Sequence, residues 1–458
     1  MKKLFAILIL LVGYKCNSQS SLSPYWNIKQ NINFPWPGAI VKYLSVPSPN
    51  VIWTVAYDNF NANRTYNYFS TSKNGGTTYT LGTVFSDTLD YGLSSIFALD
   101  SLTAWVSAYR KPASSKPSDV IFHTTNGGVT WSDGGNSSMF SGSTSFANFI
   151  AFVSPSVGIT VGDPVSNDFE IYRTTNAGTS WTVVPGVSLP NALVNEYGIA
   201  NVFATFGNSI WFGTDNGRIY RSSDAGQTWA VSTVTTAAVY GVINISFVDA
   251  NNGLALIYTG GNYSLHKSTD GGATWNVIAP LSVFLGLDDI ANVPGTTMFV
   301  SCGGNVSFNY LISYSTDLGL TWQSNWGGSL IRYFEMAFTD NITGYAGGQS
   351  NVSNASLDGM FKYSGGPLGI ENKDIAPYAF NLYPNPSNGI ITLKLPSAKN
   401  GLHISIINAL GQEVYSEEIM LQSSVGNYSF DLSKMEKGLY FFSIEKNGET
   451  FNQKIVIE

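Results

Sequence analysis

Charged residues are scarce in this chain, at 12% of 458 residues, and their balance is acidic, with a formal net charge of −7. A chain without a basic surplus lacks the lysines and arginines that neutralise phosphates, so its composition argues against a nucleic-acid partner. In place of charge the chain has many aromatic side chains, at 14%, and 46 glycines. This composition favours strands joined by turns over solvated helices.

Cysteine and long apolar runs are also nearly absent. The chain has only Cys16 and Cys302, and its most apolar run, residues 4–12, is too short to span a bilayer. Two lysines precede this run and small polar residues follow it, so residues 1–20 are predicted to be a cleaved signal peptide. Cleavage would leave Cys302 alone, without an internal disulfide. A lipid anchor on Cys16 is the alternative, although the residues before it match a lipoprotein motif poorly.

Histidine is equally rare, and the three present, His123, His266 and His403, are far apart in the sequence. They form no cluster of the kind that holds zinc. The sequence also lacks an EF-hand calcium loop, a nucleophile elbow and a phosphate-binding loop. We therefore expect neither a metal nor a cofactor.

One short phrase recurs six times at near-constant spacing. Its pattern is Ser/Thr-x-Asn/Asp-x-Gly-x-Thr/Ser-Trp/Tyr, and successive copies are 52, 50, 48, 46 and 47 residues apart. A regular period in this range indicates a repeat architecture. The central positions of the six copies are Asn74, Asn126, Asn176, Asp224, Asp270 and Asp317.

Each unit of the repeat has four short apolar runs. In the third unit, runs at 149–153, 158–161 and 169–172 precede the phrase, and a run at 181–184 follows it. Four short strands separated by turn residues predict a four-stranded antiparallel blade. In the turn before the fourth strand, Asn or Asp would accept backbone N–H groups, and glycine would supply a positive φ.

The number of fourth strands sets the expected number of blades. Their predicted starts are Tyr79, Trp131, Trp181, Trp229, Trp275 and Trp322, with a seventh candidate at Trp26. The far end supplies three strands that lack a fourth, at 334–338, 344–347 and 360–363. We therefore expect an all-β fold with a seven-bladed β-propeller over 24–367, closed by the N-terminal strand. Six blades with spare strands is the alternative, and it leaves an unpaired edge.

The recurring phrase resembles the Asp-box, or BNR, repeat, whose pattern is Ser-x-Asp-x-Gly-x-Thr-Trp. The units also resemble seven-bladed propellers related to photosystem assembly factors and to xyloglucan hydrolases. This resemblance implies that the six Asn and Asp residues shape structural turns and are not ligand sites, which agrees with how such side chains bond their own backbone.

After the last repeat the composition changes. Residues 368–379 read as a polar linker, and residues 380–458 contain alternating strands with Pro, Asn and Gly turns, which predict a small β-sandwich. This segment, with its Tyr-Pro-Asn-Pro opening and terminal Lys-Ile-Val, resembles the type A sorting domain of the type IX secretion system of Bacteroidota. The resemblance implies that 380–458 engages that machinery and that the protein is secreted or displayed on the outer cell surface. A generic carbohydrate-binding or adhesive sandwich is the alternative.

Propeller ligands meet at one end of the central channel, so we searched the loops expected there for polar and aromatic side chains. Asp163, Asp215 and Glu196 are the candidate catalytic carboxylates, since a carboxylate pair can act as acid and base or nucleophile on a sugar. The same residues also suit ordinary turns. The candidate ligand-binding residues are Trp36, Tyr109, Arg110 and Trp326. Other polar candidates are Asp58, Lys111, Asp168, Asp288, Asp289 and Glu335.

These candidates leave the function open between two classes. The first is an exported module that binds a glycan or a protein, and the second is a glycoside hydrolase or lyase that uses channel carboxylates. A sialidase is disfavoured because no Arg-Ile-Pro motif precedes the first repeat, and well-placed arginines are too few for a carboxylate clamp. A scaffold role in assembly is a third possibility.

Overall fold

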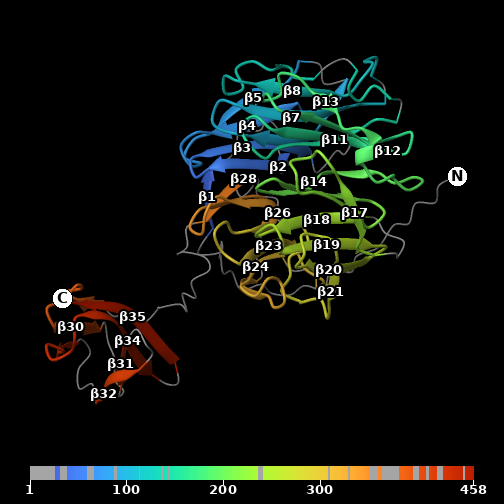
Figure 1. Ribbon diagram of the computed structural model, residues 1–458. Coiled ribbons are helices and arrows are strands. Elements are labelled where there is room, and N and C mark those ends of the chain that lie inside the picture. Colours follow the sequence, from blue (N-terminus) through green and yellow to red (C-terminus); the bar gives the residue numbers. More distant parts are fainter. Residues whose placement is uncertain are drawn as a thin grey trace, which may run out of the picture. The chain divides into compact units, whose positions relative to one another are not determined.

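The computed structural model describes residues 26–30, 39–58, 67–86, 90–112, 114–135, 138–142, 144–235, 241–307, 310–327, 331–350, 359–363, 381–395, 402–408, 412–419, 426–446 and 449–458. The predicted signal peptide, the predicted linker and Trp36 lie outside these residues. The chain divides into two compact units, Met1–Ile370 and Glu371–Glu458. Strands dominate both units (Figure 1), and the single helical turn in the described ranges is the 3-10 turn η1 (Gly186–Ser188). Within those ranges, no helix has the length and apolar content needed to cross a membrane.

The described part of the first unit contains seven four-stranded antiparallel sheets. Sheet 1 has β2 (Ala39–Ser48), β3 (Val51–Asp58), β4 (Tyr68–Ser72) and β5 (Thr80–Thr83); sheet 2 has β6 (Tyr91–Ala98), β7 (Ala104–Arg110), β8 (Val120–Thr124) and β9 (Ser132–Asp133). Sheet 3 has β10 (Ala147–Phe152), β11 (Gly158–Val165), β12 (Asp168–Thr174) and β13 (Thr182–Val183); sheet 4 has β14 (Gly198–Phe206), β15 (Ser209–Thr214), β16 (Arg218–Ser222) and β17 (Ala230–Thr233).

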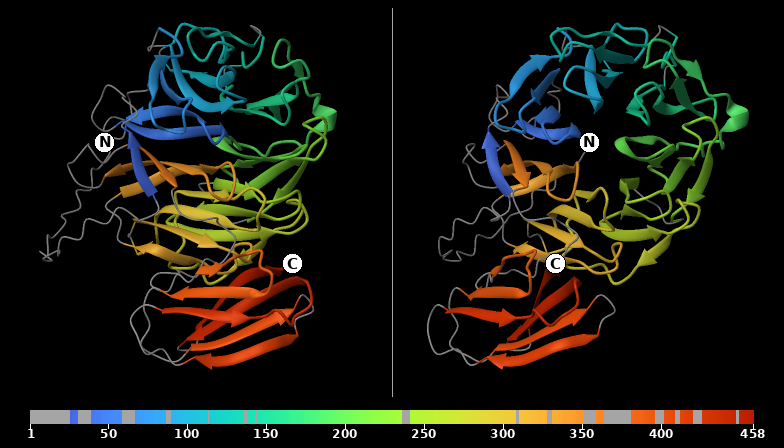
Figure 2. Two further views of the ribbon diagram at one scale, coloured as in Figure 1. Left: turned by 90° about the vertical axis from the view of Figure 1, so that its left-hand side faces the viewer. Right: turned by 60° about the vertical axis from the view of Figure 1, so that its left-hand side comes forward.

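The remaining sheets follow the same order of strands along the chain, except at the last. Sheet 5 has β18 (Gly241–Phe247), β19 (Gly253–Thr259), β20 (Asn262–Ser268) and β21 (Asn276–Ile278); sheet 6 has β22 (Asp289–Asn292), β23 (Phe299–Gly304), β24 (Tyr310–Ser315) and β25 (Gln323–Gly327). Sheet 7 has β26 (Ile331–Phe338), β27 (Gly344–Ser350) and β28 (Gly359–Tyr363), and its fourth strand is β1 (Trp26–Gln30). Figure 2 shows the sheets side by side around a common centre.

The six repeat turns share one pattern of hydrogen bonds. In the fifth copy, Asp270 Oδ1 accepts the Thr274 N–H (2.9 Å) and Asp270 Oδ2 accepts the Thr274 hydroxyl (2.6 Å). Where the central residue is Asn the hydroxyl bond reverses, so that Asn126 Nδ2 donates to Thr130 Oγ1 (2.7 Å). After each of the six turns the fourth strand begins one residue later than predicted, because the aromatic residue still belongs to the turn, whereas β1 begins at Trp26 as predicted.

Large aromatic side chains fill the spaces between neighbouring sheets. Trp211 of sheet 4 is buried and stacks on Phe247 of sheet 5, with ring centroids 3.7 Å apart. Its Nε1 donates to the Gly271 carbonyl (2.8 Å), so the indole nitrogen is satisfied although it is buried. Trp105 and Phe152 repeat this stacking between sheets 2 and 3, at 4.0 Å.

The second unit has two antiparallel sheets that share one apolar core. One sheet has β29 (Asn381–Tyr383), β30 (Ile390–Leu395) and β33 (Gly426–Asp431); the other has β31 (Leu402–Asn408), β32 (Glu413–Ile419), β34 (Gly438–Lys446) and β35 (Glu449–Ile457). Ile391 and Leu393 of the first sheet lie in the same buried cluster as Ile404 and Phe442 of the second. This shared core is what alternating apolar residues on each strand produce.

Candidate functional site

A cavity of about 380 Å³ lies at the centre of the first unit, and the first strands of six sheets line it. These strands are β2, β6, β14, β18, β22 and β26. Its volume is within the range of small-molecule sites, towards the lower end.

A recurring bulge shapes the first strands around this cavity. In five sheets the register between the first and second strands slips by one residue, and the inserted residues are Lys42, Ser94, Asn148, Ile243 and Phe334. A bulge leaves an unpaired residue and bends the strand, which frees nearby backbone N–H groups for other partners.

The freed N–H groups are bound by side chains of the preceding sheet. Asp289 Oδ2 accepts the Met336 N–H (2.7 Å), and Glu335 accepts the Leu44 N–H in turn. Ser95 Oγ accepts the Ile150 N–H (3.1 Å) in the same way. In sheets 2 and 7 the acceptor directly follows the inserted residue. These side chains therefore join adjacent sheets, and Asp289 and Glu335 also line the cavity.

One hydrogen bond joins sheets that are not neighbours. Asn201 Nδ2 of β14 donates to Glu335 Oε1 of β26 (3.1 Å), and both residues line the cavity. The register of β14 is irregular between Gly198 and Phe203, and Asn201 has a positive φ of 60°. Asparagine tolerates this conformation better than most residues, which explains its place here.

The carboxyl groups of the cavity have perturbed acidity. Burial raises the pKa of Asp289 to about 7, despite hydrogen bonds from Met336 and Asn244 that favour its charged form. Burial also raises the pKa of Glu335, and the nearby Asp289 charge adds to the effect. Lys42 is exposed, yet its surroundings lower its pKa by desolvation, while Glu335 opposes that shift.

Asp288, which also lines the cavity, forms an ion pair with an arginine side chain. Arg332 donates through Nε (2.7 Å) and Nη2 (2.5 Å) to its two carboxylate oxygens. Such a bidentate pair fixes both side chains and neutralises the charge.

The three candidate catalytic carboxylates lie outside the lining of this cavity. Asp163 is buried and accepts Asn148 Nδ2 (2.8 Å) and the Gly198 N–H (3.0 Å); its burial raises its pKa to about 6. Asp215 accepts the Tyr197 N–H (2.8 Å). Glu196 is only 2% exposed and forms an ion pair with Arg218. All three thus hold backbone or side chains of sheets 3 and 4 in place.

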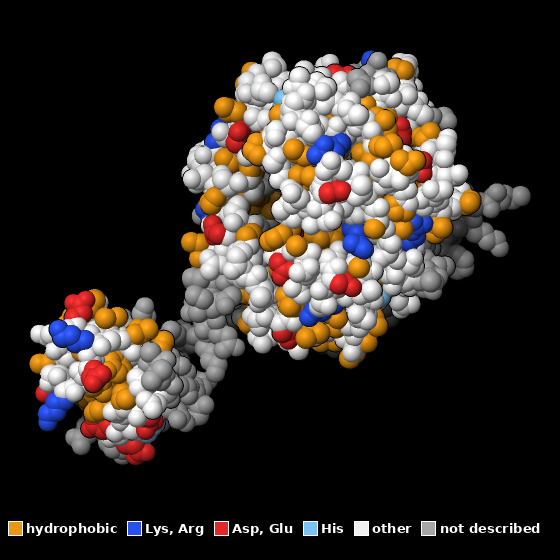
Figure 3. Space-filling view, in the orientation of Figure 1, with side chains coloured by type: hydrophobic (Ala, Val, Ile, Leu, Met, Phe, Trp, Pro, Cys, Tyr) orange, Lys and Arg blue, Asp and Glu red, His pale blue; other side chains and the backbone are white. Residues whose placement is uncertain are grey.

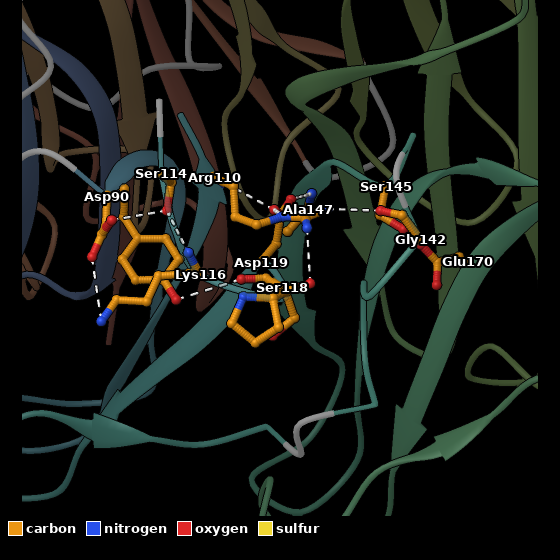
Figure 4. Close-up of polar contacts among 12 residues, drawn as sticks. Asp90, Arg110, Ser114, Lys116, Ser118, Asp119, Gly142, Ser145, Ala147 and Glu170 are labelled. Atoms are coloured by element: carbon orange, nitrogen blue, oxygen red, sulfur yellow. Dashed lines mark hydrogen bonds and ion pairs between the residues drawn. The ribbon is translucent and has the colours of Figure 1, made fainter. Parts of the chain in front are cut away.

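Arg110 lies in a separate polar cluster, shown in Figure 4. Its guanidinium bonds Asp119 (3.1 Å) and the carbonyls of Pro117 (2.8 Å) and Gly142 (2.7 Å), so it connects loops of sheets 2 and 3. Tyr109 stacks on Phe146, with ring centroids 4.7 Å apart. Trp326 belongs to β25, but its side chain is outside the described part of the structure.

Sequence reasoning missed Lys42, Asn201 and Asn244. Asn244 donates to Asp289 Oδ1 (2.5 Å) from β18. A polar residue inside an otherwise apolar first strand was the available signal, but without the bulges it could not be assigned to the channel side.

Comparisons with known proteins identify both units at the level of fold. Residues 381–458 match the secretion system C-terminal sorting domain, and residues 159–284 match the DUF6242 beta propeller domain. No curated protein matches the chain.

The chain is also similar to solved structures, at low identity. YCF48 from Cyanidioschyzon merolae is 16% identical, with a TM-score of 0.50, and the match covers 74% of this chain and 99% of that one. YCF48 bound to D1 peptide is 18% identical, with a TM-score of 0.49 and coverage of 74% and 97%. An ancestral GH74 enzyme is 13% identical, with a TM-score of 0.40 and coverage of 82% and 50%.

These matches establish an all-β chain with a propeller, followed by a sorting domain. The sorting domain indicates secretion through the type IX system to the cell surface or the extracellular space. The likeness to YCF48 supports the fold alone, since proteins of one fold carry many functions.

Proposed function

We propose that the seven four-stranded sheets are the blades of a seven-bladed Asp-box propeller, which β1 closes by pairing with β28. The register of Trp26 with Tyr363 and the shared hydrogen bonds of the six turns support this proposal. The two sheets of the C-terminal unit are proposed to form a small β-sandwich, because both contribute to one core. Residues 1–20 are proposed to be removed as a signal peptide, and 368–379 to serve as a linker.

We propose that the exported protein is a binding module whose central cavity takes the end of a glycan. The observation that carries this proposal is the Asn201–Glu335 hydrogen bond, which brings sheets 4 and 7 together across the cavity. Both groups are planar; the amide donates and accepts, and the carboxylate accepts through two oxygens, so together they suit neighbouring sugar hydroxyls. Phe203 and Phe334 also line the cavity and offer apolar surface for a sugar ring.

The proposal is tested by a glycan array and by polysaccharide binding with the purified mature chain. Asn201→Ala and Glu335→Gln are expected to weaken binding at least tenfold. Asn251→Ala is the matched control, because Asn251 lies on an exposed turn between β18 and β19. Unfolding midpoints of all variants show whether they fold. Binding that is unchanged in both cavity variants would rule out the cavity, and binding to proteins alone would favour a protein ligand.

A glycoside hydrolase is the second candidate function, and the acidity of Asp289 favours it. A carboxyl with a pKa of about 7 is protonated in part at neutral pH, as a general acid requires. Glu335 would be its partner carboxylate. This assignment replaces Asp163, Asp215 and Glu196, which do not line the cavity. Product release from a polysaccharide that disappears in Asp289→Asn would establish it; binding without products would exclude it.

A further inference from the structure

The connection between β13 and β14 reverses the usual placement of polar and apolar side chains. Four apolar residues of this connection face solvent. Their exposed fractions are 98% for Val187, 87% for Val194, 53% for Leu193 and 44% for Tyr197. The glutamate beside them, Glu196, is 2% exposed. Globular proteins normally bury valine and leucine and expose glutamate, so an inverted loop calls for an explanation.

The buried glutamate holds the loop from inside. Glu196 Oε2 accepts the Leu193 N–H (2.8 Å) and pairs with Arg218 Nη1 (3.1 Å), and Glu196 Oε1 accepts the Thr214 hydroxyl (2.7 Å). The side chains of Arg218 and Glu196 are 7% and 0% exposed. A buried ion pair contributes little net stability because both charges lose water, but it fixes the geometry of the groups that it joins.

Further bonds fix both ends of the same loop. Arg218 Nη2 and the Tyr220 hydroxyl both donate to the Asn191 carbonyl, each at 3.2 Å. The Tyr197 N–H donates to Asp215, and the Glu196 N–H donates to the Leu193 carbonyl (3.1 Å), which closes a turn with Val194 at its tip. The exposed apolar residues therefore sit on a rigid support.

A rigid, exposed apolar tip is the arrangement that lowers the entropic cost of association. Interfaces gain most of their affinity from a few apolar or aromatic anchors, and anchors ordered beforehand lose less freedom on binding. We propose that the tip formed by Leu193, Val194 and Tyr197 docks into an apolar pocket on a second protein.

The charges around the tip indicate what borders that pocket. Two partly exposed carboxylates lie beside this connection, because Asp215 accepts the Tyr197 N–H and the Asp168 carboxylate lies against Gly186. The nearby Arg218 is already paired with Glu196. Complementary charge raises the rate of association and excludes wrong partners. The pocket on the partner is therefore bordered by lysine or arginine side chains. Figure 3 shows how sparsely charged side chains cover the face that it displays.

The test uses a photo-crosslinking amino acid placed at Val194 of the full chain in the producing cell. We expect one discrete adduct with an identified protein. The same group at Val129, which is 81% exposed on a repeat turn, is the matched control and should give no such adduct. An adduct of equal yield at Val129, no adduct at Val194, an adduct only with a second copy of this chain, or one only with lipid would overturn the proposal.

The identified partner is then purified, and its affinity is measured. Leu193→Ser combined with Val194→Ser is expected to weaken binding at least tenfold, and Val129→Ser to leave it unchanged. Both changes are on exposed side chains, so folding should be preserved. Added salt should slow association with the unmodified protein, because the partner's basic border is screened. Equal affinity in the double variant would also overturn the proposal.

Discussion

Trp26 and Tyr363 stand opposite each other in the register of β1 and β28, with their ring centroids 5.6 Å apart. They come from the two ends of the first unit. Trp26 is fully buried, and it also contacts Tyr333 and Phe338. One aromatic cluster thus supports the pairing that completes sheet 7.

Replacing Trp26 with alanine should remove the main apolar contact of β1. A buried tryptophan changed to alanine costs about 3–5 kcal/mol of unfolding free energy. Urea unfolding of the mature chain, followed by tryptophan fluorescence and circular dichroism, measures the loss. Val187→Ala, at a residue 98% exposed, should change stability by less than about 0.5 kcal/mol. Equal midpoints for the two variants would show that β1 is dispensable.

The repeat turns supply their own control for a change at Asp270. Asp270→Ala removes the acceptor of two Thr274 bonds and should cost about 1 kcal/mol, as loss of a side-chain cap does. Asp270→Asn should cost much less, because Asn74, Asn126 and Asn176 accept the equivalent N–H. Thermal unfolding of the three proteins measures the order. A loss as large in Asp270→Asn as in Asp270→Ala would contradict this account.

Asp270 should also affect acid stability. The Thr274 hydroxyl and N–H lower its pKa from 3.8 to about 2, so the folded state holds its proton less tightly than the unfolded state. Its contribution is present above pH 3.8 and is lost as the pH falls towards 2. Asp270→Asn should therefore show a shallower loss of stability between pH 4 and pH 2, and an unchanged slope would refute the assignment.

His266 should weaken the fold as the pH falls through a higher range. Burial lowers its pKa below 6.5, its Nε2 lies 2.9 Å from Ser264 Oγ, and its Nδ1 is buried without a partner in the described structure. Below about pH 6.5 His266 therefore binds a proton more readily in the unfolded chain than in the folded chain, so the free energy of unfolding decreases. His266→Gln should reduce the difference in melting temperature between pH 7.5 and pH 5. His403 lies in the other unit, on β31, so His403→Gln should leave the transition of the first unit unaltered.

Deletion of residues 381–458 tests whether export depends on the second unit and folding of the first unit does not. The deletion should stop delivery to the cell surface or medium, because it removes the sorting domain. The unfolding midpoint of the remaining chain should not change, since the first unit has its own core. Cell fractionation and thermal melts measure the two effects. Undiminished export of the shortened protein would contradict the first expectation, and a shifted midpoint the second.

The repeat allowed the strands to be located from sequence, although some extend three or four residues further than predicted, as β11, β26 and β27 do. Its turns depend on local chemistry, with an Asx side chain, a hydroxyl and a glycine at fixed spacing, and local rules of this kind are legible in a sequence. The Trp26 strand was also recognisable, because Trp26-Asn27-Ile28 repeats the pattern of Trp275-Asn276-Val277.

The lining of the cavity was less accessible to such reasoning. Asp289 and Glu335 were recognisable as candidates by residue type, but the search was directed at loops, and both lie on first strands, β22 and β26. A bulge moves every later side chain of a strand to the opposite face of the sheet. The inserted residues Lys42, Ser94 and Ile243 share no residue type from which a bulge could be predicted. The partners Asn201 and Glu335 come from distant repeats, so their contact depends on the assembled ring of sheets.

The pairing of β1 with β28 has a consequence for biosynthesis. The ribosome makes β1 first, but its partner is available only after Gly359–Tyr363 has been translated, so this contact has a very high sequence separation and closes late. A chain interrupted before Gly359 keeps β1 without its partner strand, with an open strand edge and without the contact between Trp26 and Tyr363. Proteases and chaperones recognise such exposed edges, so the pairing of β1 with β28 distinguishes finished chains from incomplete ones.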